Sequence, residues 1–391
     1  MVQQHRGSDE PSKKPLVAFL GPVSSFTHQA TKSTFPGSEW ELVPVVTIRD
    51  VFEVVQAGDA DYGVVPFENS THGAVTFTLD SLADRDGSYA DLSICGEVYL
   101  DVHHFLLGHA APAAAPPTGL PPLEDDAAGG VAGAAAAASS SDGSGTCTPT
   151  ASQPHPLRPR ARPLAALRHV RRVYSHPQAF GQTAAFLGAY LRGVDTVDVT
   201  STSRAAQLAA EDPTGGSAAI AGEIAAEVHG LEVLARCIED REDNTTRFFV
   251  IRRGAAGAGG EGVPPAPVRL AGLGGGEGSE TGRPTGEEGE GAEAGKKQGG
   301  GKTKTMVSFT VPHQAPGALA DVLDVFRKYG LNLTSINSVP SLIRPFQYLF
   351  FVEFEGSRHD DPEGRVEAAF GEVDKVAQGW RWLGSWENQR P

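Results

Sequence analysis

Four residues of this sequence could together bind an anionic molecule and move a proton. Glu68 and Asn69 follow one short apolar run, and Thr246 and Arg247 stand just before another. A carboxyl group can supply a proton, a threonine hydroxyl can donate a hydrogen bond, and the planar arginine fork suits a bidentate carboxylate. The set therefore suits acid-assisted chemistry on a substrate that carries carboxylates.

Hydroxyl side chains gather at two predicted helix starts, and Ser175 ends a further apolar run. Helix N-termini bind carboxylates without a lysine, because they offer unpaired N–H groups and a partial positive charge. In open α/β sheets such groups meet beyond the carboxyl ends of the strands. We therefore expect a shared cleft lined by the following hydroxyls: Ser24, Ser25, Thr27, Ser201, Thr202 and Ser203.

Short apolar runs alternate with helical patterns over residues 15–253, which predicts an α/β fold. The run at 62–67 is continuous in apolar character and predicts a strand buried on both faces of a parallel sheet. The strand-like runs are Leu16–Leu20, Tyr62–Phe67, Val173–Ser175, Val197–Thr200, Ala218–Ala221, Val233–Cys237 and Phe248–Ile251.

Three segments have compositions that cannot bury a core. Residues 1–14 are polar, residues from about 111 to 163 are Ala-, Pro-, Gly- and Ser-rich, and residues 254–303 are rich in Gly, Glu and Lys. Such compositions predict disorder. The chain then divides into an interrupted α/β domain over 15–253 and a C-terminal domain over 304–391.

The C-terminal block has a different order of elements. Its apolar periodicity predicts strand, helix, strand, strand, helix and strand, which is the βαββαβ order of a ferredoxin-like domain. The expected elements are Met306–Val311, Gly317–Tyr329, Leu331–Ile336, Gln347–Glu355, Gly364–Val373 and Trp380–Trp386.

Charge and composition exclude several classes of protein. A formal net charge of -15 over 391 residues argues against nucleic acid or an anionic membrane as partner. The sequence contains no apolar run of about 18 residues, the length that would be needed to span a bilayer. The 3 cysteines are widely spaced, so they suit a reducing, cytoplasmic location and predict neither a metal site nor a cofactor.

Five motifs in order resemble the prephenate dehydratase family, over roughly 16–108, 167–253 and 304–386. The resemblance implies a two-lobed catalytic domain like type II periplasmic binding proteins, with the active site between the lobes, followed by an ACT regulatory domain. The implied reaction converts prephenate to phenylpyruvate in phenylalanine biosynthesis, without a cofactor. The motifs are GPVSSFT at 21–27, VPFENS at 65–70, YSHPQAF at 174–180, STS at 201–203 and NTTRF at 244–248.

The resemblance assigns roles to the first four residues. Thr246-Arg247-Phe248 matches a signature triplet whose threonine is essential in the family. Because prephenate loses carbon dioxide and hydroxide as its ring becomes aromatic, the enzyme mainly orients the substrate and helps hydroxide leave. We expect Thr246 to donate a hydrogen bond to that oxygen and Arg247 to hold a carboxylate. Glu68, beside Asn69, is expected to supply the proton with a pKa raised toward neutrality.

Further positions match family residues that contact the substrate. Ser175 is one, and Gln182 lies seven residues later, which predicts a place two turns into the following helix. Phe248 completes the triplet and is counted with them. His176, which precedes Pro177, is interpreted as structural rather than as a base. For Glu68, the alternative is a helix N-cap formed by the segment from 68 to 71.

The C-terminal block carries two matches to phenylalanine-binding elements. Gly317, Ala318 and Leu319 match the first, and Asn337 and Ser338 belong to the second. The second differs from the family pattern at two of four positions, so feedback by phenylalanine is expected to persist in altered or weakened form. ACT domains pair with one another, which implies a homodimer or homotetramer.

Two other functions stay open at this point. Arogenate dehydratase performs the same chemistry on the aminated substrate, and one or two cleft residues could decide between them. A non-catalytic amino-acid sensor could use the same folds without chemistry. The complete set of candidate catalytic residues favours an enzyme.

Overall fold

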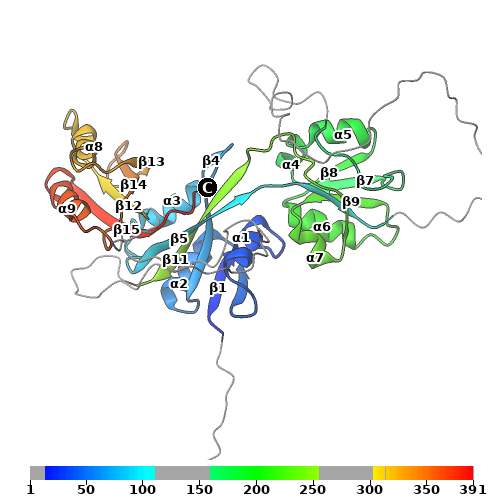
Figure 1. Cartoon of the computed structure of the whole chain (residues 1–391), viewed down its shortest axis with the longest axis horizontal. Helices are drawn as coiled ribbons and strands as arrows, with labels where there is room; N and C mark the ends of the chain where they lie inside the picture. The colour runs from blue at the N-terminus through cyan, green and yellow to red at the C-terminus, as the bar shows by residue number, and fades with distance from the viewer. Residues whose placement is uncertain (1–13, 111–158, 255–302, 313, 391) are drawn as a thin grey trace, which may run out of the picture. The chain divides into compact units, whose positions relative to one another are not determined.

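A computed structural model describes residues 14–110, 159–254, 303–312 and 314–390 (Figure 1). The segments expected to be disordered lie almost wholly outside the described residues. The chain forms two compact units, which are described separately. Unit 1 contains residues up to Pro22, Thr27–Leu100 and the residues from Thr245 onward, and unit 2 contains Val23–Phe26 and Asp101–Asn244.

Unit 1 is built on one sheet whose strands come from both ends of the chain (Figure 1). Its order is β13-β14-β12-β15-β5-β11-β3-β1-β2, and β4 pairs with β3 off this path. The strands are β1 (Leu16–Leu20), β2 (Glu41–Val45), β3 (Tyr62–Asn69), β4 (Gly73–Ala74), β5 (Leu92–Asp101), β11 (Thr245–Arg253), β12 (Thr303–Thr310), β13 (Leu333–Pro340), β14 (Tyr348–Glu355) and β15 (Gly379–Glu387). The helices are α1 (Phe26–Thr34), α2 (Ile48–Ala57), α3 (Thr76–Ala83), α8 (Ala318–Lys328) and α9 (Arg365–Val376).

The N-terminal part of this sheet is mixed rather than parallel. β1 pairs in parallel with β2 and β3, but β11 pairs with β3 in the antiparallel sense. We expected β3 to lie between two parallel neighbours. This is correct for β1 and wrong for β11. The chain returns from unit 2 through β11, which runs against β3.

The sequence of α2 explains its position against this sheet. Thr47 and Asp50 form a reciprocal capping box at its N-terminus, and Gly58 ends it in the left-handed conformation. The buried positions recur with helical spacing, so one apolar face packs on the sheet. They are Ile48, Val51, Phe52 and Val55.

The C-terminal subdomain, residues 303–387, has the expected βαββαβ order. Its strands lie in the order β13-β14-β12-β15, as in a ferredoxin-like fold. One face of this sheet packs against α8 and α9, where Val322, Phe326 and Phe370 are buried. The other face contributes Phe351 and Trp386 to the core of the N-terminal part, so the subdomain is packed on both sides.

Gly384 joins the two parts of the sheet. It pairs with Ile94 of β5, the one register contact between β15 and β5 among the described residues. A Cβ at position 384 would lie 2.1 Å from the Ile94 carbonyl oxygen, and the φ of Gly384 is 149°. Only glycine permits this approach of two backbones.

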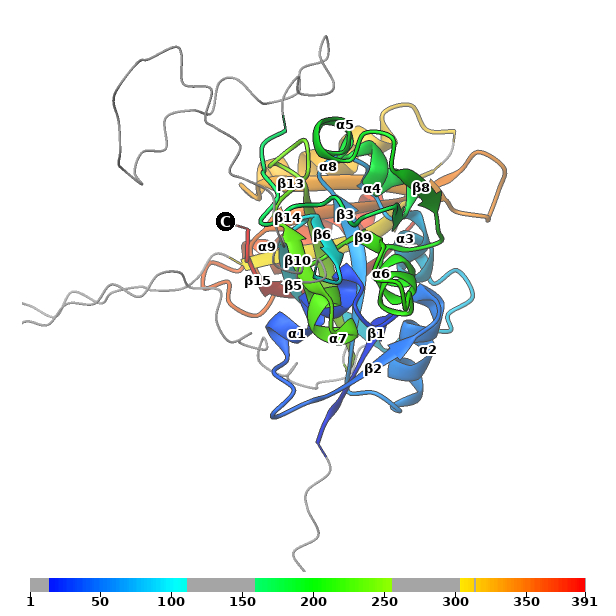
Figure 2. The same cartoon turned by 90° about the vertical axis from the view of Figure 1, so that its right-hand side faces the viewer.

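Unit 2 has a five-stranded sheet in the order β10-β6-β9-β7-β8, with helices on both faces (Figure 2). β7 is parallel to β8 and β9, whereas β6 is antiparallel to β9 and β10. Phe186 belongs to the core on one face, and Ala205 and Ala225 belong to the core on the other. The elements are β6 (Phe105–Gly108), β7 (Arg172–Ser175), β8 (Asp195–Asp198), β9 (Ser217–Ala221), β10 (Glu232–Ala235), α4 (Pro177–Gly181), α5 (Ala184–Tyr190), α6 (Thr202–Ala210) and α7 (Ile224–His229).

Every strand-like run named from the sequence is found as a strand, although β8 lies two residues earlier than expected. Among the described helices, none combines the length and the apolar character needed to cross a bilayer. The predicted domain boundaries at 253 and 304 stay predictions.

Candidate active site

The pairing of β3 with β11 divides the candidate catalytic residues between two faces of the sheet. Thr246 lies opposite Asn69 and Arg247 opposite Glu68, but Phe248 then lies opposite Pro66. The register shift leaves one extra residue on β3, which is a β-bulge at Phe67.

The bulge re-aims the side chains that follow it. Phe67 stacks on Phe249 with ring centroids 4.1 Å apart, so it faces the core. After the extra residue, Glu68 shares that face with Arg247, and both line one pocket. Because side chains alternate along a strand, Asn69 and Thr246 lie on the opposite face. The helix-capping alternative for Glu68 is wrong, since α3 begins only at Thr76.

Asn69 holds the Thr246 hydroxyl in a defined orientation. The Asn69 Nδ2 donates to Thr246 Oγ1 at 2.9 Å. Its Oδ1 accepts from the backbone N–H groups of Thr71 and His72 at 3.1 and 3.0 Å, which fixes which end of the amide faces Thr246. Because the hydroxyl oxygen accepts this bond, its own proton is directed away from Asn69.

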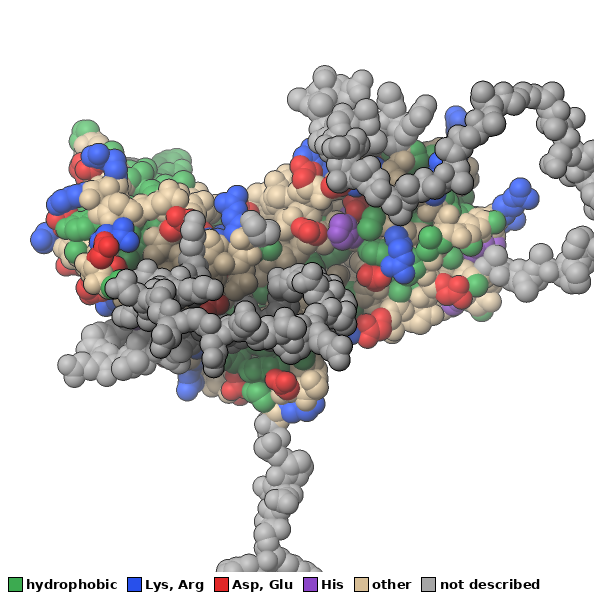
Figure 3. Space-filling view, in the orientation of Figure 1, with side chains coloured by type: hydrophobic (Ala, Val, Ile, Leu, Met, Phe, Trp, Pro, Cys, Tyr) green, Lys and Arg blue, Asp and Glu red, His purple; other side chains and the backbone are tan. Residues whose placement is uncertain are grey.

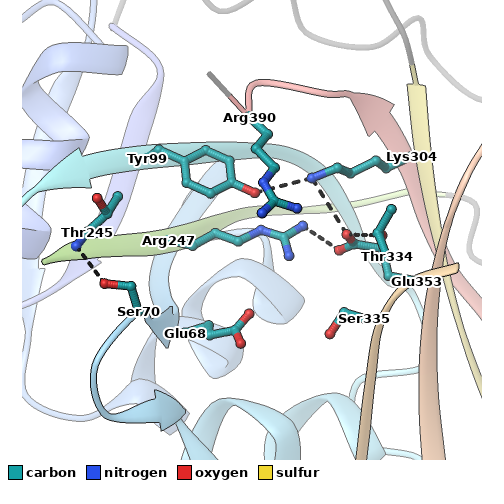
Figure 4. Close-up of a pocket in the computed structure, with 10 residues that line it drawn as sticks. All are labelled: Glu68, Ser70, Tyr99, Thr245, Arg247, Lys304, Thr334, Ser335, Glu353 and Arg390. Carbon is teal, nitrogen blue, oxygen red and sulfur yellow. Dashed lines mark hydrogen bonds and ion pairs between the residues drawn. The ribbon is translucent and has the colours of Figure 1, made fainter. Parts of the chain in front are cut away.

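Arg247 belongs to a buried charge cluster, defined here as Glu97, Arg247, Lys304 and Glu353. Figure 4 shows Arg247, Lys304 and Glu353 of this cluster. The guanidinium contacts Glu97 Oε2 at 2.5 Å and also Glu353. Lys304 Nζ lies 3.1 Å from Glu97 Oε1 and 3.6 Å from Glu353 Oε1. The four side chains are at most 7% exposed.

Electrostatics keep Arg247 charged despite its burial. Burial alone would lower the pKa of Arg247, but the attraction of Glu97 and Glu353 outweighs it and raises the pKa. Burial also raises the pKa of Tyr99, whose hydroxyl accepts from Lys304 Nζ at 3.2 Å. The cluster is therefore two cations against two carboxylates.

A cavity of about 380 Å³ lies beside the cluster, between the β3–β11 pair and the C-terminal subdomain (Figure 4). Thr334 donates to Glu353 Oε1 at 2.6 Å, so this wall of the cavity is held by hydrogen bonds. The lining residues are Glu68, Ser70, Tyr99, Thr245, Arg247, Lys304, Thr334, Ser335, Glu353 and Arg390.

In unit 2, two predicted substrate-binding segments lie at one edge of the sheet. Ser175 ends β7 and pairs with Asp198 of the parallel β8, after which the chain enters α6. Ser201 is the N-cap of α6 and accepts from the Arg204 N–H at 3.1 Å, so the predicted helix start is confirmed. The Ser175 hydroxyl is fully buried and donates to the Ile220 carbonyl at 2.8 Å.

Gln182 is not two turns into a helix, so that expectation is wrong. α4 ends at Gly181, and Gln182 is its C-cap residue. Its Oε1 instead accepts a hydrogen bond from His104 Nε2 at 2.7 Å. His176 caps the start of α4 by accepting from the Gln178 N–H, in agreement with its interpretation as structural.

The N-terminal hydroxyls occupy different environments. Ser24 is buried with a left-handed φ of 72°, and its Oγ lies 3.1 Å from His229 Nε2. Thr27 is buried within α1, whereas Ser25 is half-buried. Phe248 is fully buried in β11, so it contributes to the core.

Comparisons with known proteins connect this arrangement to one family. The family model of prephenate dehydratase matches residues 17–115 and 160–256. A bifunctional chorismate mutase/prephenate dehydratase of Aquifex aeolicus is 32% identical over 374 residues, which cover 96% of this chain and 74% of the relative.

The chain belongs to the prephenate dehydratase family. It is accordingly a hydro-lyase, and the α/β fold with a C-terminal βαββαβ subdomain agrees with this assignment.

Solved structures support the fold of this family member. A prephenate dehydratase of Arthrobacter aurescens in complex with L-Phe matches with a TM-score of 0.63 and 24% identity, over 96% of this chain and 91% of that one. A structure described as a novel type of quorum quenching acylase matches with a TM-score of 0.61 and 23% identity, over 96% and 98% of the two chains. Because the second carries a different description, the likeness establishes the fold alone.

The contacts of Arg247 differ from the expectation that it holds a substrate carboxylate. Its guanidinium is already held by two carboxylates of the same chain, so we interpret Arg247 as a residue that positions the neighbouring Thr246. A contact between Arg247 and a substrate carboxylate stays a prediction.

Sequence reasoning did not find three members of the buried charge cluster. Glu97, Lys304 and Glu353 stand inside strands that otherwise read as apolar or half-buried. The sequence did offer one indication. A charged residue at a strand position whose side chain faces the core predicts an ion pair with another buried charge. Its partners could not be named, because they lie on strands far apart in the sequence.

We predict that Arg247→Met lowers the free energy of unfolding by about 3–5 kcal/mol, because it leaves Glu97 and Glu353 buried with one cation between them. Urea denaturation followed by circular dichroism measures the change. Arg49→Met is the matched control, since Arg49 pairs with Glu53 on the surface and its loss should leave the free energy of unfolding nearly unchanged. Equal effects of the two substitutions would contradict the role assigned to the cluster.

Proposed function

We propose that the chain converts prephenate to phenylpyruvate, carbon dioxide and water, with Thr246 assisting the departure of the ring hydroxyl. The observation that supports this role is the hydrogen bond from Asn69 Nδ2 to Thr246 Oγ1. It comes from an amide whose orientation is fixed by backbone donors, so the hydroxyl proton is directed away from Asn69 and is available for donation to a substrate.

The reaction requires little from the protein beyond orientation and a hydrogen-bond donor. As the bond from the ring to its carboxylate breaks, the electron pair moves through the ring and the carbon–oxygen bond at the para position breaks. Carbon dioxide and hydroxide leave, and a proton converts hydroxide to water. Aromatisation drives the step, so a hydroxyl aimed at the departing oxygen lowers the remaining barrier.

The proton source is a separate question. Glu68 lies on the face of the β3–β11 pair that carries Arg247, whereas the Thr246 hydroxyl lies with Asn69 on the other. Direct transfer from Glu68 to an oxygen bound at Thr246 is therefore not favoured. The role of Glu68 as proton donor stays a prediction. It is tested by comparing the kcat of Glu68→Gln with that of the wild type.

The substrate carboxylates suit hydroxyl-rich helix starts. In unit 2, α6 begins at Thr202 after the Ser201 cap, and its first N–H groups offer partial positive charge. We assign Ser201 and Thr202 to carboxylate binding on this basis.

We expect Thr246→Ala to lower kcat by about a hundredfold, because the departing oxygen loses its donor. Thr246→Ser keeps the hydroxyl and should retain most of the activity. The measurement is the appearance of phenylpyruvate, with folding checked by circular dichroism. Near-normal turnover of Thr246→Ala would exclude the proposed role.

Steady-state kinetics on both molecules distinguish the two candidate substrates, with phenylpyruvate measured as the product of prephenate and phenylalanine as the product of arogenate. Wild-type protein is given prephenate and arogenate in parallel, and the two kcat/KM values are compared. A preference for arogenate of about tenfold or more, which is about 1.4 kcal/mol of transition-state binding, would replace prephenate by arogenate as the substrate.

We further propose that phenylalanine regulates this chain through the C-terminal subdomain. A groove of about 480 Å³ includes Gly317, Ala318 and Leu319 at the start of α8. Gly317 is the N-cap residue with a φ of 85°, so the first N–H groups of an 11-residue helix can bind a carboxylate while apolar walls hold a ring. Asn337 and Ser338, expected to share in this, lie on β13 and do not line the groove within one chain.

Phenylalanine should inhibit the wild-type enzyme, and Ala315→Trp should raise the half-inhibitory concentration at least about tenfold by filling the groove, a loss of about 1.4 kcal/mol. Ala315 is an exposed lining residue. Ala368→Trp on the exposed face of α9 serves as control. The ratio of inhibited to uninhibited rate is compared for each variant. Absence of inhibition in the wild type would reject feedback by phenylalanine.

An apolar surface on the subdomain supports self-association. β13 is the edge strand of the sheet, and apolar side chains on β13 and in the chain from 342 to 348 are exposed. Figure 3 shows apolar side chains gathered where α8 and β13 lie. An exposed apolar edge strand readily pairs with another chain. The residues are Leu333, Ile336, Leu342, Ile343, Phe346 and Tyr348.

We propose a homodimer built on this edge. Ile336→Lys combined with Phe346→Lys should convert dimers to monomers in sedimentation velocity experiments, because each substitution places a charge in an apolar interface. Val46→Lys adds a charge at a residue that is 86% exposed in the N-terminal part and should leave the dimer intact. A dimer that survives the double substitution would place the interface elsewhere.

A cytosolic location completes the proposal. Within the described residues Cys95 and Cys237 are free thiols, and burial raises the pKa of Cys95 to about 12. Free thiols suit a reducing compartment. Recovery of the protein in an oxidising compartment on cell fractionation would contradict it.

A further inference from the structure

Three potential metal ligands converge in unit 2. His103 lies two residues before β6, and Cys237 and Glu239 follow β10. β6 and β10 are antiparallel neighbours, with Leu107 paired to Val233, so the start of one lies beside the end of the other (Figure 2).

The ligand atoms of the three residues are close enough for one ion. One nitrogen, one sulfur and one carboxylate oxygen all lie within 4.8 Å of one another. His103 Nδ1 is 2.9 Å from Glu239 Oε1. Two ligands of a tetrahedral zinc ion lie about 3.2–3.8 Å apart, given bond lengths of about 2.0–2.3 Å. The bound of 4.8 Å is about 1 Å above this range, so side-chain rotation must close the remaining gap.

Backbone contacts already hold the carboxylate in place. The Glu239 side chain is 3% exposed, and its second oxygen accepts from the buried His104 N–H at 2.9 Å. The Ile238 N–H donates to the His104 carbonyl at 2.9 Å, which ties the two segments together. An outer hydrogen bond that orients a ligand is typical of protein metal sites.

The charge of Glu239 is balanced by little else. Among the described residues, its ion-pair partner is His103, whose side chain is 45% exposed. The two nearby arginines are engaged by other carboxylates: Arg236 by Glu223 at 2.7 Å, and Arg160 by Glu242. A divalent cation between His103 and Glu239 would take the place of the hydrogen bond that joins them.

We propose that His103, Cys237 and Glu239 bind one divalent transition-metal ion, with zinc as the ion that best fits the set. Imidazole, thiolate and carboxylate are all zinc ligands, and three protein ligands leave a fourth position open to water. Hard cations such as magnesium and calcium prefer oxygen ligands and do not fit a thiolate.

The site would fasten the two chain segments that enter and leave unit 2. His103 lies close to Asp101, the first residue of the long unit 2 segment, and Glu239 lies close to Asn244, its last. The Val102 N–H donates to the Asn244 carbonyl at 2.7 Å, so these segments already meet. A bound ion would add a clamp that stabilises unit 2 against unfolding.

The first test is metal binding by the chelator-treated full-length protein. Zinc is titrated in competition with a chromophoric chelator, and one equivalent is expected to bind to the wild type. Cys237→Ser and His103→Gln should each weaken zinc binding by at least about tenfold. Cys147→Ser, which changes a cysteine outside the described residues, should leave the affinity unchanged.

Cobalt supplies a second measurement that reports the thiolate directly. Cobalt(II) bound through Cys237 should give a near-ultraviolet thiolate-to-cobalt absorption in the wild type, in Cys147→Ser and not in Cys237→Ser. Circular dichroism checks that the variants fold. The proposal is overturned if zinc binds Cys237→Ser and His103→Gln as tightly as the wild type, if no stoichiometric zinc is bound, or if the cobalt band follows Cys147.

Discussion

The buried charge cluster is the interaction on which the arrangement of unit 1 depends. An isolated ion in a protein interior costs several kcal/mol, and this cost is offset only when partners of opposite charge are in place. Glu97, Arg247, Lys304 and Glu353 come from β5, β11, β12 and β14, so each strand supplies the charge that another requires. The C-terminal subdomain and the strand that carries Thr246 therefore form one cooperative structure.

This constraint acts on the candidate catalytic residue from both faces of the sheet. On one face, Arg247 fixes β11 against the C-terminal subdomain; on the other, Asn69 orients the Thr246 hydroxyl. Direct contacts between buried charges therefore connect the C-terminal subdomain with the strand that carries Thr246.

The sequence predicted the parts of the fold that depend on local patterns. Continuous apolar runs located the strands, and the Ser201 cap marked a helix start. Changes in the spacing of apolar residues gave the βαββαβ order of the C-terminal subdomain. It failed where distant strands decide the outcome. Helical spacing placed Gln182 in a helix that ends at Gly181, and the partners of Arg247 depend on pairings between strands separated by long stretches of chain.

The bulge at Phe67 shows why matching residue types to a family did not define the site. Glu68 and Asn69 are adjacent in the sequence, and alternation alone already separates their side chains. Which of them joins Thr246 depends on the register after the extra residue, which puts Asn69 opposite Thr246 and Glu68 opposite Arg247. A neutral amide that fixes a hydroxyl, with the carboxylate kept on the other face, favours a donor that remains protonated while the hydroxide departs. A charged carboxylate in that place would instead accept a hydrogen bond from the threonine hydroxyl, which could then no longer donate to the leaving group.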